Sequence, residues 1–215
     1  MNPKNNSYKD KLRSKKVKPV ILVGGKSRRF GRDKFYLEFN GRLVIERTYS
    51  LLKRVFNEEP LFVGREALPP PFISIPDVTI GLGPIGGLYT ALDCVDADFV
   101  FLTACDMPLI NEDVLRYMFN NLNSNCQVYL PRFRNGMIEP LFAFYSVGLK
   151  YKVKRSIEAR DFRMRSLLEG SLVEYLDESE IKSIDEELLS FLNINTKNDL
   201  DKIIGKLHCE RNRDY

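Results

Sequence analysis

The stretch PVILVGGKSRRFGRDK (residues 19–34) indicates the fold more strongly than any other part of the chain. Its first seven residues form an apolar run that ends at two glycines, which is typical of a buried strand. The loop that follows, residues 24–34, carries five cationic side chains against a single acid, Asp33. Glycines let backbone amides face an anion, and cationic side chains pair with phosphate. We therefore interpret the loop as a binding site for a nucleoside triphosphate rather than as a solvated basic loop.

Apolar runs alternate with helix-like patterns along the next hundred residues. The pattern predicts strands within 35–39, 61–64, 72–77 and 98–106, and helices over 44–55, 84–94 and 111–122, with Pro84 starting one helix and Asn111 capping another. The second half predicts strands over 126–133 and 137–145, helices near 147–159 and 163–169, and a last helix near 196–207. Such alternation favours a three-layer α/β fold with a mostly parallel, Rossmann-like sheet.

Charge and composition narrow the class of protein. The chain has 215 residues and a net charge of +4, yet residues 1–18 alone carry seven cationic side chains and one acid, a net +6. The rest therefore sums to −2, so the basicity lies in a terminal tail, which we expect to be flexible, and nucleic acid is not an expected partner. No apolar run is long enough to span a membrane, and no secretory leader is visible, so a cytoplasmic enzyme is expected. Residues 19–215 predict one domain.

Two acidic residues end predicted strands. Asp106 closes the most apolar run, DFVFLTACD, and Met107-Pro108 turns the chain away. Ligands of parallel sheets bind at the carboxyl ends of the strands, and Mg²⁺ binds one or two carboxylates together with phosphate and water, so Asp106 is a candidate magnesium ligand. The alternative is a turn or cap before the proline. Asp77 ends another strand, just before the glycine-rich segment GLGPIGG (81–87), where ordinary turn chemistry is an equal explanation.

Two familiar phosphate-binding patterns are incomplete. Gly25-Lys26-Ser27 looks like the end of a Walker A loop, but Val20 stands where that motif needs its first glycine. GLGPIG (81–86) matches GxGxxG, but it does not lie in the first strand–helix turn. A dinucleotide-binding oxidoreductase therefore stays a minor alternative.

Five successive motifs together resemble the molybdenum cofactor guanylyltransferases. They are VILVGGKSRRFGRDK, IPDVTIGLGPIGGLYTAL, FVFLTACDMPLI, GMIEPLF and FLNINTKNDL, in that order between about residues 19 and 207. The resemblance implies a fold of the glycosyltransferase-A and nucleotidyltransferase type. It implies a half that binds GTP, about 19–125, and a half that binds molybdopterin, about 126–207.

The resemblance also implies roles for individual residues. Those expected to contact GTP or its phosphates are Leu22, Val23, Gly24, Gly25, Lys34, Asp77 and Gly83, and those expected near the pterin side are Glu139, Pro140, Leu141, Asn193, Asn195 and Thr196. Asp106 would bind Mg²⁺, and Lys34 and Arg29 would stabilise the triphosphate and the leaving pyrophosphate. Transient contacts with other cofactor-biosynthesis proteins or with recipient molybdoenzymes are also expected.

The expected reaction transfers GMP from GTP to the phosphate of molybdopterin and releases pyrophosphate. An anionic phosphate needs little help from a base, so a chain with one histidine, His208, can catalyse it. The alternatives are a cytidylyltransferase, a sugar- or polyol-phosphate nucleotidyltransferase, and a GTP-binding regulator without catalysis.

Overall fold

A single seven-stranded sheet organises the part of the chain that the computed structural model describes, residues 15–23, 38–39, 41–64, 68, 70, 72–78, 81–194 and 198–199. Its order is β5-β4-β1-β6-β8-β7-β9. The strands are β1 (Val17–Leu22), β4 (Leu61–Val63), β5 (Ile73–Ile75), β6 (Phe99–Ala104), β7 (Val128–Arg132), β8 (Phe142–Ser146) and β9 (Val173–Asp177). Only β8 runs antiparallel to its neighbours, β6 and β7; the other pairings are parallel. The predicted, mostly parallel sheet is confirmed.

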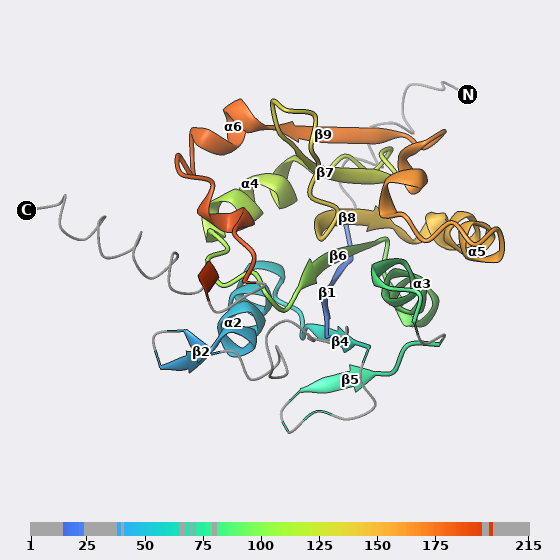
Figure 1. Cartoon of the computed structure of the whole chain (residues 1–215), viewed down its shortest axis with the longest axis horizontal. Helices are drawn as coiled ribbons and strands as arrows, with labels where there is room; N and C mark the ends of the chain where they lie inside the picture. Colours follow the sequence, from blue (N-terminus) through green and yellow to red (C-terminus); the bar gives the residue numbers. More distant parts are fainter. Residues whose placement is uncertain are drawn as a thin grey trace, which may run out of the picture.

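Helices cover both faces of this sheet, which makes the fold three-layered (Figure 1). One face carries α2 (Val44–Phe56), α4 (Glu112–Asn121) and α6 (Glu178–Lys182), and the other carries α3 (Pro84–Cys94), α5 (Lys150–Glu158) and the short 3-10 helices η3 (Val147–Leu149) and η4 (Met164–Leu168). The central strand shows why both layers are needed. Phe99 and Phe101 of β6 pack against the α2 and α4 layer, whereas Val100 and Leu102 pack against the α3 and α5 layer.

Local signals in the first half predict element ends well. Helix α3 begins at Pro84, where a missing amide costs nothing. Helix α4 is capped by Asn111, whose side chain accepts hydrogen bonds from the amides of Asp113 (2.8 Å) and Val114 (3.4 Å). A small hairpin of β2 (Glu38–Phe39) and β3 (Arg42–Leu43) turns at Gly41, which has a φ of 72°.

The sheet begins earlier than the sequence predicts. β1 starts at Val17, so the last two residues of the expected 1–18 tail pair with β6. Lys18 forms an ion pair of 3.0 Å with Glu58, and Lys16 one of 2.6 Å with Asp96. Residues 1–14 lie outside the described residues.

The second half differs more from the sequence prediction. β8 begins at Phe142 instead of Met137, because residues 133–138 form a turn in which the Phe133 amide bonds to the Met137 carbonyl (2.8 Å) and Gly136 has a φ of 76°. The helix expected near 163–169 is the 3-10 helix η4. β9, α6 and η5 (Leu189–Phe191) were not predicted. Most of the expected helix near 196–207 lies outside the described residues.

No helix within the described ranges is long and apolar enough to cross a membrane.

Candidate active site at the carboxyl edge of the sheet

The carboxyl ends of neighbouring strands lie in register along one edge of the sheet. The Cys105 amide, just after β6, donates to the Leu22 carbonyl at the end of β1 (3.2 Å). On the other side of β1, the Val23 amide donates to the Val63 carbonyl of β4 (2.8 Å). The peptide between Leu22 and Val23 therefore lies beside the one that leads into Asp106, at this edge of the sheet.

Several predicted site residues belong to parts of the chain that are not described. These are Gly24, Gly25, Arg29, Lys34 and Asn195, together with Thr196. Their roles stay predictions. Val23, which directly precedes the 24–34 loop in the sequence, is described and lies at this edge of the sheet.

A tight approach of α3 to β1 defines the first part of the site. A Cβ built on Gly87 would lie 2.6 Å from Leu22 Cδ2 and 3.6 Å from Asp77 Oδ1, so two of the five motifs meet at this point. A side chain on Gly87 would therefore require the end of the Leu22 side chain to move. Gly83, at the amino end of α3, has a φ of 68° and leaves that helix end exposed.

Asp77 carries a polar atom that its own neighbours do not satisfy. Within the described residues, Asp77 Oδ1 is buried and has no hydrogen-bond partner. Burial raises the pKa of this carboxyl above its ordinary value. Buried acceptors in proteins are nearly always paired, so an orphan at a strand end is a candidate contact for a ligand donor.

Two predicted residues from distant parts of the chain, Glu139 and Asn193, lie near Asp106 on its β8 side. Burial raises the pKa of Glu139, and the negative charge of Asp106 raises it further. Hydrogen bonds from the Leu141 amide (3.0 Å) and from the Asn193 side chain act in the opposite direction and favour the carboxylate. The carbonyl of Asp106 accepts a hydrogen bond of 2.9 Å from the Ile194 amide. Asp106, Glu139 and Asn193 therefore form one cluster.

The loop that presents Glu139 is itself fixed. The hydroxyl of the fully buried Tyr145 donates to the Pro140 carbonyl (2.8 Å), and the Phe142 amide donates to the Glu139 carbonyl (3.3 Å). Glu139 thus stands at the start of β8, at the same edge as the end of β6. Sequence reasoning placed Glu139 through the family resemblance alone. A local signal was present, however: like Asp106, it is an acid closely followed by proline at a strand end.

The donor set suits a hard divalent cation better than a zinc ion. Among the residues that the structure covers, no three His, Cys, Asp or Glu side chains gather around one point. Two carboxylates, Asp106 and Glu139, are close enough for their charges to repel. Magnesium and manganese are held by few carboxylates and complete their shells with water and phosphate, so this cluster fits such an ion.

A groove elsewhere on the surface is not this site. It has a volume of about 790 Å³ and follows the outer side of α2, lined by residues that include Arg47, Tyr49, Arg54, Phe72 and Pro108. Among the predicted site residues that the structure describes, none lines this groove.

Comparison with known proteins shows the family to which the chain belongs. An α/β sheet with a glycine-tight helix start and an acidic pair along its carboxyl edge is the arrangement of a nucleotidyltransferase. Residues 19–178 match the MobA-like NTP transferase domain family. The chain belongs to this family, that of the molybdenum cofactor guanylyltransferases, and it is a nucleotidyltransferase enzyme.

Individual relatives match over nearly their full length. A protein of Thermococcus sibiricus named "Probable molybdenum cofactor guanylyltransferase" is 37% identical over 87% of this chain and 97% of its own. The molybdenum cofactor guanylyltransferase of Syntrophotalea carbinolica is 33% identical over 85% and 88%. The crystal structure of molybdopterin-guanine dinucleotide biosynthesis protein A from Archaeoglobus fulgidus superposes with a TM-score of 0.71 at 25% identity, covering 90% of this chain and 99% of that one.

Proposed function

We propose that the enzyme transfers GMP from GTP to the phosphate of molybdopterin, releasing pyrophosphate and forming the guanine dinucleotide form of the cofactor. The observation that carries the proposal is the division of one sheet edge into two parts. Leu22, Gly87 and the unsatisfied Asp77 lie on one side of Asp106, and Glu139 and Asn193 lie on the other. Asp106 stands where the two substrates would meet.

The nucleotide would occupy the β1, β4 and β5 side. There Asp77 Oδ1 offers an acceptor to an N–H or O–H group of the nucleotide. Gly83, where a side chain would meet nothing within 4 Å, would let a flat or sugar-like group approach the start of α3 closely. The triphosphate would lie on the 24–34 loop, with Lys34 and Arg29 balancing its charge and that of the leaving pyrophosphate.

The acceptor would occupy the β8 side, near Glu139 and Asn193. One of its phosphate oxygens attacks the α-phosphorus of GTP, the bond from that phosphorus to the β-phosphate oxygen breaks, and pyrophosphate carries away the electron pair. The attacking oxygen is already anionic, so no proton has to be removed. Catalysis then rests on alignment of the two substrates and on neutralisation of the charges that repel them.

A divalent cation, which we take to be Mg²⁺, would be held by Asp106 and would neutralise phosphate charge at the point of transfer. Because GTP is a cytoplasmic nucleotide, we also place the reaction in the cytoplasm. Contacts with other cofactor-biosynthesis proteins or recipient molybdoenzymes would serve delivery of the product.

A nucleotide panel tests the proposal with the full-length chain. The melting temperature is measured with GTP, CTP, UTP, ATP, NAD and NADP at equal concentration and with MgCl₂. GTP should raise it most, because a ligand stabilises the folded state according to its affinity. Pyrophosphate release should then require both GTP and molybdopterin. A larger shift with CTP or UTP would indicate a sibling transferase, and a larger shift with NAD or NADP would indicate an oxidoreductase. GTP binding without pyrophosphate release would indicate a regulator.

A further inference from the structure

A buried acid and a buried serine hold the segment that follows α6. Asp185 and Ser190 are only 6% and 0% exposed. Asp185 Oδ1 accepts a hydrogen bond from the Leu189 amide (2.9 Å), and Oδ2 accepts two, from the Ser190 amide (2.8 Å) and the Ser190 hydroxyl (2.7 Å). We call this pair the Asp185–Ser190 clip. A buried carboxylate is costly unless it is paired, and its charge-assisted hydrogen bonds are strong and directional.

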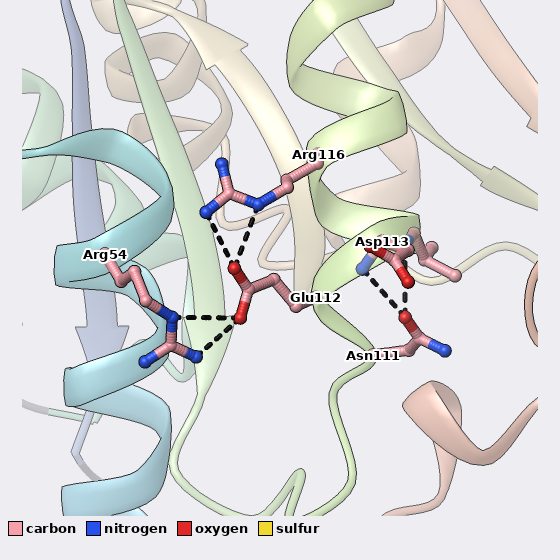
Figure 2. A network of polar contacts seen from close by, with 6 residues as sticks. Arg54, Asn111, Glu112, Asp113 and Arg116 are labelled. Atoms are coloured by element: carbon pink, nitrogen blue, oxygen red, sulfur yellow. Dashed lines mark hydrogen bonds and ion pairs between the residues drawn. The ribbon is translucent and has the colours of Figure 1, made fainter.

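The clip also reaches the loop that follows Asp106. The Ser190 hydroxyl, which donates to Asp185, accepts a hydrogen bond of 3.0 Å from the Asn111 amide. Asn111 uses its own side chain to cap α4, as Figure 2 shows, so its backbone position is fixed from two sides. One hydroxyl therefore connects the segment that follows α6 to Asn111, the last residue of the 106–111 loop.

The same segment contacts the near end of that loop. After Ser190, the ring of Phe191 makes edge-to-face contacts with the rings of Phe133 and Phe142, with 5.2 Å and 5.3 Å between the ring centroids. Three residues further on, the Ile194 amide bonds to the Asp106 carbonyl (2.9 Å). Asn193, which bonds to Glu139, lies between these anchors. The segment thus bridges both ends of the 106–111 loop and carries an acceptor-side residue.

We infer that the Asp185–Ser190 clip is a positioning device that sets Asp106 and Asn193 relative to each other, and so aligns the acceptor with the metal-binding carboxylate. The inference rests on the proposed function. Asp185 and Ser190 themselves touch no substrate; they act through Asn111, Ile194 and Asn193. The clip lies on the β8 side of the site, away from Leu22, Asp77 and Gly87, so it should affect the acceptor and the cation and leave GTP binding unchanged.

Ser190→Ala in the full-length protein is the test variant, because it removes the link to Asn111 and leaves two of the three hydrogen bonds to Asp185. With wild-type transfer established, its KM for molybdopterin and its half-saturating Mg²⁺ concentration should each rise at least about fivefold, with KM for GTP within about twofold. A reduced amount of folded enzyme would lower turnover without moving any of these constants. Asp185→Asn should change them in the same direction.

Amide hydrogen exchange tests the clip without any transfer assay. In Ser190→Ala, the Asn111 and Ile194 amides should exchange roughly tenfold faster, while amides of β6 keep their wild-type protection. Ser183→Ala, which removes an exposed hydroxyl bonded to the Glu180 carbonyl (2.6 Å), and Glu186→Gln are the matched controls and should behave as wild type.

The two hypotheses fail in different ways. An inactive wild-type protein, tested with GTP, molybdopterin and Mg²⁺, would refute the proposed function and leave the exchange result standing on its own. Unchanged Ile194 exchange in Ser190→Ala, an equal increase throughout β6, or a KM for GTP that rises as much as that for molybdopterin would each overturn the inference about the clip.

Discussion

The side chain of Leu22 occupies the space into which any side chain on Gly87 would project, with 2.6 Å between Leu22 Cδ2 and a Cβ built on the glycine. Helix α3 therefore packs directly against the Leu22 side chain at the end of β1. The obstructing atom is the end of a flexible side chain, so the fold can accommodate a methyl group, but only if the side chain of Leu22, an expected nucleotide contact, moves.

Gly87→Ala should therefore affect binding more than folding. Alanine favours a helix over glycine by about 0.5–1 kcal/mol, which offsets part of the cost of moving Leu22, so the free energy of unfolding should change by less than about 1 kcal/mol. KM for GTP should rise roughly tenfold, measured by pyrophosphate release. Gly148→Ala is the control, because the new methyl group would lie 3.5 Å from its nearest neighbour, Ser146 Oγ. Equal GTP affinities in both variants would contradict a nucleotide site beside Leu22.

Asp77→Asn should weaken nucleotide binding and slightly stabilise the free enzyme. Burial raises the pKa of Asp77, so its charged form is disfavoured in the folded state. The associated stability is present when the carboxyl is protonated, below its ordinary pKa near 4, and is lost as the pH rises through the higher folded value. The variant should melt roughly 1–3 °C above wild type at pH 7, and this difference should shrink towards pH 4. A variant that melts higher yet binds GTP as tightly as wild type would exclude Asp77 from the nucleotide site.

Asp106→Asn should keep the fold and lose the reaction. The substitution preserves size and removes the charge that would hold the cation, so turnover should fall at least about a hundredfold at millimolar Mg²⁺. The comparison is Asp113→Asn, which neutralises an exposed acid at the start of α4 and should retain activity. Normal turnover of Asp106→Asn, assayed with Mg²⁺, would remove the metal assignment.

Glu112→Gln should lower stability in a pH-dependent way. Glu112 links two helices of one layer, accepting hydrogen bonds from Arg54 of α2 (3.0 and 2.5 Å) and from Arg116 of α4 (2.9 and 2.7 Å), as Figure 2 shows. These two arginines lower the pKa of Glu112 to about 2. The stabilisation is complete above the ordinary glutamate pKa and disappears as the pH falls towards 2.

The free energy of unfolding should fall by about 1 kcal/mol or less at pH 7, because the three charged side chains are partly exposed and their interaction is screened by water and salt. Urea unfolding of both proteins at pH 7, 4 and 2.5 measures it, and the difference should decrease along this series and in 1 M NaCl. Glu158→Gln, at an exposed position of α5, serves as the control. A difference that persists at pH 2.5 would show that packing rather than charge is involved.

Local signals account for most of what the sequence predicted correctly. Pro84 and Asn111 mark helix starts through their own local chemistry, and the apolar run before Asp106 is typical of a strand covered on both faces. Parallel strands share a carboxyl edge, so the sequence places Leu22 and Asp106 at the same edge of the sheet. These inferences required no knowledge of distant contacts.

Distant contacts explain what the sequence did not reveal. MIEPLFAFY reads as one strand, but Glu139 and Pro140 belong to a turn, because the Tyr145 hydroxyl and the Leu141 amide hold that turn in place. Ser190 accepts a hydrogen bond from Asn111, 79 positions earlier, and the residues around Ser190 in the sequence do not indicate this partner. β9 pairs only with β7, so its identity as a strand depends on a neighbour that its own short, partly exposed sequence does not indicate.

Because β8 runs antiparallel to its neighbours, the proposed nucleotide and acceptor sides of the site can change independently in evolution. The end of β7 and the start of β8 both lie at the edge of the sheet that carries the candidate site. The connection between them, residues 133–141, carries Glu139. Insertions or deletions in this bend would change the proposed acceptor side of the site and leave unchanged the strands β1, β4 and β5, which we propose hold the nucleotide. A lineage could in this way adopt a new phosphorylated acceptor while inheriting its nucleotide pocket unchanged.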